Sequence, residues 1–194
     1  TEKPVWKALS RGEIEINYIN NWVIIRSTEI QVQVPVVMRK ERERKRAFIV
    51  GFILNGPNLN RLGTREPHIY GKETLVDLEK RCRVKAKTLG LELEFRQTNF
   101  EGVLVESVHD AIDHAHGIII NPAGLTFTSV PIMDSLKMFD GPKVELHISN
   151  VHTREAVYHN SLMSKVVTAV MAGFGTSGYL LALDWMAERL SVEK

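Results

Sequence analysis

The stretch AFIVGFILNGPNLN, residues 47–60, decides the fold, because an apolar strand runs directly into a loop of glycine, proline and asparagine. Continuous apolar runs are typical of parallel strands that are buried on both faces. Four further segments are predicted to be strands of the same sheet: LELEFRQT (91–98), GIIIN (117–121), VELHI (144–148) and VVTAVMA (166–172). The sequence therefore predicts a five-stranded parallel sheet.

Helical patterns fill the intervals between these strands. Apolar residues recur at helical spacing over 74–89 and 103–115, and a last helix is predicted over 177–190. The run TSVP (128–131) has a hydroxyl cap followed by proline in the first turn, so another helix is predicted from there to about Phe139. Alternating strands and helices indicate an α/β fold, a doubly wound sheet with helices on both faces. Ligands of such sheets bind beyond the carboxyl ends of the strands.

The first 46 residues have a different pattern. Polar and apolar residues alternate in EIEINY (13–18) and IQVQV (30–34), which predicts strands with one buried face. We therefore divide the chain into a β-rich N-terminal extension with a basic linker, residues 1–46, and a main domain, residues 47–194. The run RKERERKR (39–46) has six positive and two negative side chains, whereas the whole chain has a net charge of only +2. A solvated linker is the favoured interpretation, and contact with a protein or RNA partner is the alternative.

Several other classes of protein are disfavoured by composition. Cys82 is the only cysteine, which excludes an internal disulfide and a cysteine-built zinc site and suits a reducing compartment. The sequence has no run of ~18 apolar residues, so no membrane span is predicted, and the first residues lack the pattern of a secretory signal. We expect a soluble intracellular protein of the cytoplasm or an organelle matrix. GFGTSG (173–178) matches a dinucleotide fingerprint, but only 16 residues follow it, so nucleotide binding is disfavoured.

Residues with acid–base chemistry follow the predicted strand ends. The loop at 55–71 is long and rich in glycine, proline, arginine and asparagine, as binding loops often are. In the fourth strand, Glu145 and His147 are two residues apart and so share one face of the sheet. A carboxylate in this position can hold an imidazole in one tautomer and keep it basic enough to transfer a proton. The sequence therefore predicts proton-transfer chemistry at this edge of the sheet.

Together, these segments resemble the type II 3-dehydroquinate dehydratases. The resemblance extends from the first core strand to about Leu190 and rests on NGPNLN (55–60), GTREP (63–67), YG (70–71), RQTN (96–99), NP (121–122), ELHISN (145–150) and GYLL (178–181). It implies a flavodoxin-like fold, trimers assembled into dodecamers, and dehydration of 3-dehydroquinate, a small anionic substrate, without metal or cofactor. The first 46 residues lie outside it.

The resemblance also implies roles for individual residues. Tyr70 would remove the proton beside the ketone, and Arg65 would lower the pKa of its phenol. Asn58 would stabilise the enolate through an ordered water, because developing charge is best met by preorganised donors. His147 would protonate the departing hydroxyl, and Glu145 would orient it.

Other residues are expected to bind the substrate or a neighbouring subunit. Asn121, Ile148 and Ser149 would hold the substrate carboxylate, with backbone N–H groups at a helix start as an anion site. Asp134 would approach the site of a neighbouring subunit. Tyr158 is expected to contact the substrate, at a position where the family has arginine.

Two positions depart from the family pattern. Phe127 stands where the family has a substrate-contacting histidine, and Tyr158 replaces the arginine. Both changes remove polar groups from the hydroxyl end of the pocket, and unpaired hydroxyls in an apolar pocket are costly. We expect reduced affinity. The alternatives are a related hydroxy-ketone acid as substrate, or a catalytically inactive structural subunit of a larger assembly.

Overall fold

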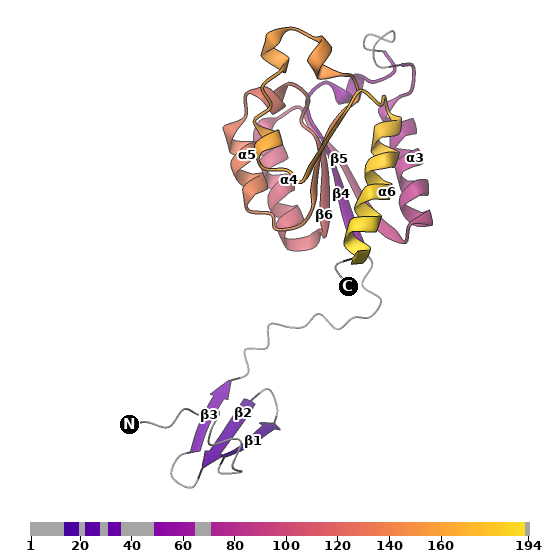
Figure 1. Ribbon diagram of the computed structural model, residues 1–194. Coiled ribbons are helices and arrows are strands. Elements are labelled where there is room, and N and C mark those ends of the chain that lie inside the picture. Colours follow the sequence, from indigo (N-terminus) through magenta and orange to yellow (C-terminus); the bar gives the residue numbers. More distant parts are fainter. Residues whose placement is uncertain (1–13, 20–21, 28–30, 36–48, 65–70, 193–194) are drawn as a thin grey trace. The chain divides into compact units, whose positions relative to one another are not determined.

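The computed structural model describes residues 14–19, 22–27, 31–35, 49–64 and 71–192, and the side chains of 51–64 and 71–191. The chain divides into two compact units, residues 1–47 and 48–194 (Figure 1). In the first unit, the backbone forms an antiparallel sheet of β1 (Ile14–Ile19), β2 (Trp22–Ser27) and β3 (Gln31–Pro35), in that order. The alternating pattern picked out the segments of β1 and β3. It missed β2, because WVIIRS does not alternate.

The second unit contains the parallel sheet. Its strands are β4 (Ile49–Asn55), β5 (Leu91–Gln97), β6 (Gly117–Asn121), β7 (Lys143–His147) and β8 (Ala169–Ala172), in the order β5-β4-β6-β7-β8. All four neighbouring pairs are parallel, which confirms the predicted five-stranded parallel sheet. The last strand begins three residues later than predicted, because the N–H groups of Val166 and Val167 donate to the Met163 carbonyl and close the preceding 3-10 turn, Met163–Lys165.

Four α-helices of the described part of the chain connect and cover these strands: α3 (Leu75–Thr88), α4 (Glu101–His114), α5 (Val130–Lys137) and α6 (Ser177–Val192). The predicted start of α5 is confirmed, since the Ser129 side chain accepts from the Ile132 backbone N–H at 3.0 Å. At the start of α3, Thr74 and Asp77 form a capping box, and the hydrogen bonds from Thr74 lower the pKa of the Asp77 carboxyl. Local side-chain chemistry therefore fixes where these two helices begin.

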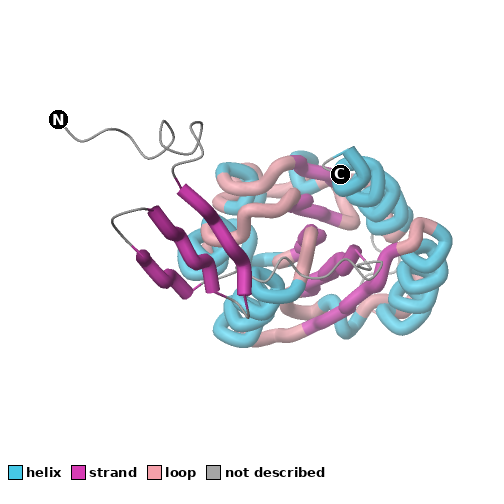
Figure 2. Tube along the Cα trace, turned by 90° about the horizontal axis from the view of Figure 1, so that it is seen from below, coloured by secondary structure: helices cyan, strands magenta, loops and turns pink. Residues whose placement is uncertain are grey.

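The sheet is covered on both faces, as Figure 2 shows. Alternating side chains of the strands supply two separate cores. Ile53 packs in the core that includes α3 and α6, and Leu54 packs in the core that includes α4 and α5. Both side chains are fully buried. This arrangement leaves the two ends of the sheet as the places where loops gather.

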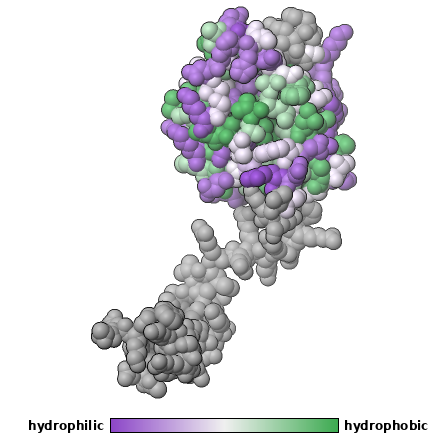
Figure 3. Space-filling view, viewed as in Figure 1, coloured by the Kyte–Doolittle hydropathy of each residue, from purple (hydrophilic) through white to green (hydrophobic). Residues whose placement is uncertain are grey.

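Some large apolar side chains remain on the surface of this unit. Phe100 is 72% exposed, and Val84 and Val157 are also exposed. Val170, in the edge strand β8, is 51% exposed. Figure 3 shows apolar residues gathered near the middle of one face. Among the described residues, no helix is long and apolar enough to cross a membrane.

A buried tyrosine ties together the carboxyl ends of β4 and β6. The Tyr179 hydroxyl donates to Asn55 Oδ1 at 2.7 Å and accepts from Asn121 Nδ2 at 2.9 Å. Burial raises the pKa of the Tyr179 phenol above its usual value, so the hydroxyl stays neutral and keeps its proton to donate. The remaining amide groups are also engaged, with Asn55 donating to the Arg96 carbonyl and Asn121 accepting from the Ala123 N–H. The strand ends are thus held by a satisfied polar network.

The loops after β4 and β6 also meet backbone to backbone. The Gly56 N–H donates to the Asn121 carbonyl at 2.8 Å. A Cβ at Gly56 would lie 2.4 Å from the Pro122 carbonyl oxygen and 2.6 Å from its carbon. Only glycine allows this approach, because the neighbouring atoms belong to the backbone and cannot rotate away.

Replacing Tyr179 with phenylalanine should lower the free energy of unfolding by about 1–3 kcal/mol, because two buried amides lose a partner. Urea denaturation followed by circular dichroism measures the change. Ser191→Ala is the control, since Ser191 is exposed and its hydroxyl donates to the Ala187 carbonyl within its own helix, α6. Equal stability of Tyr179→Phe and the unmodified protein would show that the network contributes nothing.

Gly56→Ala should also destabilise the fold, by about 1–3 kcal/mol, because the added methyl group overlaps the Pro122 backbone. The matched control is Gly102→Ala in α4, where a Cβ meets no atom within 4 Å and alanine favours the helix. Thermal unfolding of the two variants should give opposite changes. A Gly56→Ala protein as stable as Gly102→Ala would contradict the proposed close approach.

Candidate active site

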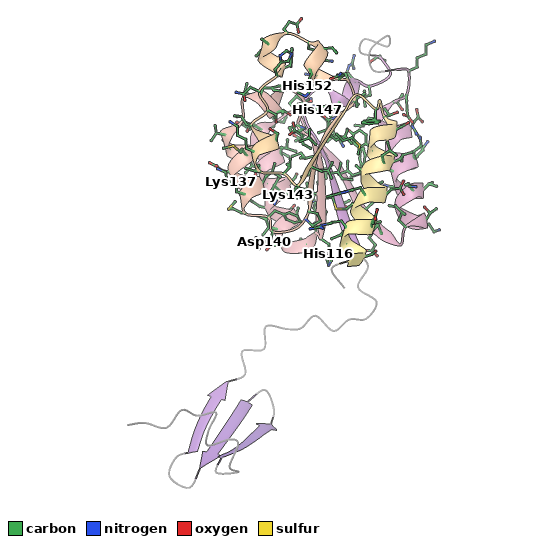
Figure 4. The ribbon with its side chains drawn as sticks, in the orientation of Figure 1. His116, Lys137, Asp140, Lys143, His147 and His152 are labelled. Carbon is green, nitrogen blue, oxygen red and sulfur yellow. The ribbon has the colours of Figure 1, made fainter. Side chains whose placement is uncertain are left out.

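A cavity of about 220 Å³ opens where the loops after β4, β6 and β7 meet. Its walls comprise Asn58 and Leu59 from the first loop, Asn121, Ala123, Gly124 and Phe127 from the second, and His147, Ile148, Ser149, Val151, Arg154 and Tyr158 from the third. His147 lies at the carboxyl end of β7 and Lys143 at its start, and Figure 4 shows them at different heights along the sheet. The cavity therefore occupies the edge that the strand pattern predicted.

Asn58 reaches the cavity through an unusual backbone conformation. Its φ of 68° is in the left-handed region, which asparagine tolerates better than most residues. The Asn58 N–H donates to Asn99 Oδ1 at 3.0 Å. Gln97 Nε2 donates to the same Asn99 oxygen and to the Gly56 carbonyl, which links this loop to the end of β5. The position of Asn58 is thus held from two neighbouring strands.

Glu145 and His147 form a buried acid–base pair. His147 Nε2 lies 2.7 Å from Glu145 Oε1, and the two side chains are 6% and 1% exposed. Glu145 lies behind His147 and is not part of the cavity wall, whereas His147 is. With Nε2 directed at the carboxylate, the second ring nitrogen is left for a bound molecule. This geometry matches the pairing that the two-residue spacing predicted.

Ser161 completes the surroundings of the carboxylate. Its hydroxyl lies 2.8 Å from Glu145 Oε1 and 3.0 Å from Oε2, within donating distance of both. Sequence reasoning missed Ser161, because it is 16 residues from Glu145 in a segment without regular periodicity. It also missed Arg154, which lines the cavity.

An aromatic wall stands beside the histidine. The Phe127 ring stacks on the His147 ring with centroids 6.0 Å apart and an interplanar angle of 18°. The Tyr158 ring meets Phe127 edge-on at 5.4 Å, and Arg154 Cζ lies 5.4 Å from the Tyr158 centroid. Phe127 and Tyr158 therefore occupy one side of the cavity together, and polar residues such as Asn121 and Ser149 contribute elsewhere to its wall.

The described structure leaves two of the predicted site residues untested and places Asp134 away from this cavity. Arg65 and Tyr70 lie outside the described residues. Asp134 lies on α5, where it is exposed and pairs with Lys137 at 2.8 Å. The described part of the chain also contains no cluster of three or more histidine, cysteine, aspartate or glutamate residues that could hold a metal ion.

Comparison with known proteins relates most of the second unit to one family. The family model Dehydroquinase class II matches residues 49–187. A 3-dehydroquinate dehydratase of Bartonella henselae is 53% identical over 142 residues, 73% of this chain and 96% of the relative. Catabolic 3-dehydroquinase 1 of Fusarium vanettenii is 52% identical over 138 residues, 71% of this chain and 96% of the relative.

Solved structures give the same result. The type II dehydroquinase of Propionibacterium acnes superimposes with a TM-score of 0.70 and 42% identity, covering 73% of this chain and 99% of the other. A 3-dehydroquinate dehydratase-like protein of Bifidobacterium longum has a TM-score of 0.57 and 33% identity, covering 74% of this chain and 99% of the other. Since the family model spans most of the sequence and relatives share more than half of the aligned residues, this chain belongs to the class II dehydroquinase family.

Proposed function

We infer that the chain is a 3-dehydroquinate dehydratase, a hydro-lyase that removes water from 3-dehydroquinate to give 3-dehydroshikimate. The observation that carries this inference is the Glu145–His147 pair, buried at 2.7 Å against the wall of a small cavity. Relatives with this name are 52–53% identical over about 70% of the chain. The elimination needs one group that removes a proton and one that protonates the departing hydroxyl, and His147 suits the second task.

For the first step, we assign Tyr70 as the base. As a phenolate it takes the proton from the carbon beside the ketone, and the electron pair of that C–H bond moves toward the ketone oxygen. Free tyrosine has a pKa of ~10, so ionisation near neutral pH requires help, and the guanidinium of Arg65 can favour the charged form. The family resemblance supports both assignments.

In the second step, the enolate collapses and the hydroxyl leaves. Asn58 stabilises the negative charge on the enolate oxygen, a role supported by its place on the cavity wall. His147 donates a proton to the hydroxyl, the C–O bond breaks, and the enolate electrons form the new double bond while water departs. Glu145 stabilises the charged imidazole before this transfer.

The substrate carboxylate is assigned to the side of the cavity formed by Asn121, Ile148 and Ser149. All three line the cavity. The Asn121 amide is fixed by Tyr179 and by the Ala123 N–H, so it meets a ligand in a preset orientation. A preorganised polar group binds an anion at a lower cost in conformational entropy than a mobile one.

Larger-scale assignments follow from the same family membership. Residues 47–194 form the proposed domain, and its strand order, 2-1-3-4-5 along the chain, supports a flavodoxin-like assignment. We infer a homo-oligomer of trimers assembled into a dodecamer, supported by exposed apolar side chains such as Phe100, with Asp134 near a neighbouring site. For residues 1–46, which lie outside the family resemblance, a solvated linker in the basic run is the favoured interpretation and contact with a protein or RNA partner is the alternative.

Mixing the purified protein with 3-dehydroquinate should produce the enone absorbance of 3-dehydroshikimate. His147→Ala and Tyr70→Phe should each lower kcat by about 10²–10⁴-fold, the usual contribution of a general acid or base. His109→Ala is the matched control, because His109 is an exposed histidine of α4. No product from the unmodified protein at saturating substrate would refute the dehydratase function, and full activity of His147→Ala would refute its role as the acid.

The aromatic wall makes a second prediction for this function. In a Phe127→His/Tyr158→Arg variant, the new imidazole and guanidinium would replace the two rings and could form hydrogen bonds with the substrate hydroxyls. Because hydrogen bonds to charged groups contribute about 1.5–3 kcal/mol, KM for 3-dehydroquinate should fall by about tenfold or more. Steady-state kinetics measure this change, with Val157→Ala, an exposed neighbour, as control. An unchanged or higher KM would show that the two rings do not weaken substrate binding.

A further inference from the structure

Ser161 lies between two short 3-10 turns, Ala156–Tyr158 and Met163–Lys165, and three hydrogen bonds of Ser161 and its neighbour Leu162 hold it in place. Its Oγ accepts the Ser164 backbone N–H at 3.0 Å, and its carbonyl accepts the Ser164 hydroxyl at 3.1 Å. The next residue, Leu162, donates its N–H to the Thr126 carbonyl at 3.0 Å. Met163 is fully buried in the core. The turn that presents Ser161 is therefore anchored to the domain.

These contacts determine what the Ser161 hydroxyl can do. Because its oxygen accepts from the Ser164 N–H, its single proton is available to the nearby carboxylate. Glu145 Oε1 at 2.8 Å and Oε2 at 3.0 Å are both within reach. The carboxylate is 1% exposed, and burying an ionised carboxyl group is costly unless donors replace its water. Ser161 supplies one such donor, in addition to the His147 ring.

We propose that Ser161 is a positioning residue that acts on His147 through Glu145. Its hydroxyl favours the ionised, correctly oriented carboxylate, and this carboxylate in turn favours the protonated imidazole. The catalytic consequence rests on the proposed function, in which His147 must carry a proton to the departing hydroxyl. Ser161 itself does not line the cavity and does not touch the reacting atoms.

Besides Glu145, the charged, titratable or aromatic side chains that the described residues place near the imidazole come from the loops after β6 and β7. Arg154 and Tyr158 line the cavity with His147, and Phe127 covers one face of its ring. A serine-to-alanine change at 161 alters none of these side chains. A change in His147 titration in that variant therefore reports the loss of the Ser161 hydroxyl, which bonds to Glu145 and to the Ser164 N–H.

The test compares Ser161→Ala with Ser161→Thr, which keeps a hydroxyl, and with Ser164→Ala, a serine of the same turn that does not contact Glu145. The full chain is produced with isotope-labelled histidine, and the His147 imidazole is titrated by NMR, its signal assigned with His147→Gln. In Ser161→Ala, the midpoint should move to lower pH by about 0.5–1 unit, because the protonated ring loses support. Ser161→Thr and Ser164→Ala should stay within about 0.2 unit of the unmodified protein.

Kinetics provide the second measurement. Ser161→Ala should lower kcat about tenfold, leave KM within about twofold, and move the alkaline limb of the kcat profile to lower pH. Ser161→Thr should restore all three. A His147 midpoint unmoved in Ser161→Ala, or moved equally in Ser161→Thr or Ser164→Ala, overturns the proposal. If the midpoint moves as expected but the unmodified protein forms no product, the dehydratase function fails while the link from Ser161 to His147 stands.

Discussion

The hydrogen bonds of one buried hydroxyl, that of Tyr179, hold the strand ends on which the cavity depends. Asn55 ends β4 and Asn121 ends β6, and both amides bond to this group from the start of α6. The loops carrying Asn58 and Phe127 begin within a few residues of these amides. A shift of either strand end would break a buried hydrogen bond. The free-energy cost of losing that bond exceeds the cost of moving an exposed loop. The positions of both loops are therefore coupled to the core.

A second constraint is the burial of a carboxylate without exposure to water. Glu145 is 1% exposed, and its described partners are the His147 ring and the Ser161 hydroxyl. Each partner satisfies the carboxylate and is oriented by it in return. Because buried polar networks tolerate few geometries, the histidine is held at the cavity wall before any ligand arrives. Preorganisation of this kind is what proton transfer in a fixed direction requires.

The sequence predicted the fold well because its strongest signals are local. Continuous apolar strands and the Ser129 cap identified the sheet and the start of α5 without reference to distant residues. The pairing of Glu145 with His147 was also predictable, since it depends only on the period of a strand. The contacts of Ser161 and Tyr179 were not predicted, because they join distant segments. Ser161 is 16 residues from Glu145, and Tyr179 is 58 and 124 residues from Asn121 and Asn55. β2 was missed because a continuous apolar run does not alternate.

Phe127 and Tyr158 together have an effect on the cavity wall that neither residue has alone. Phe127 contacts both the His147 ring and the Tyr158 ring, so the two residues form one continuous aromatic surface. Glu145 holds the imidazole by a bond within the plane of the ring. The stacked Phe127 ring restricts movement of the imidazole perpendicular to that plane. Polar side chains at both positions would instead form hydrogen bonds with the hydroxyls of a bound ligand and with the imidazole. The aromatic wall thus adds a second restraint on the imidazole, and this effect belongs to the pair of rings rather than to either residue.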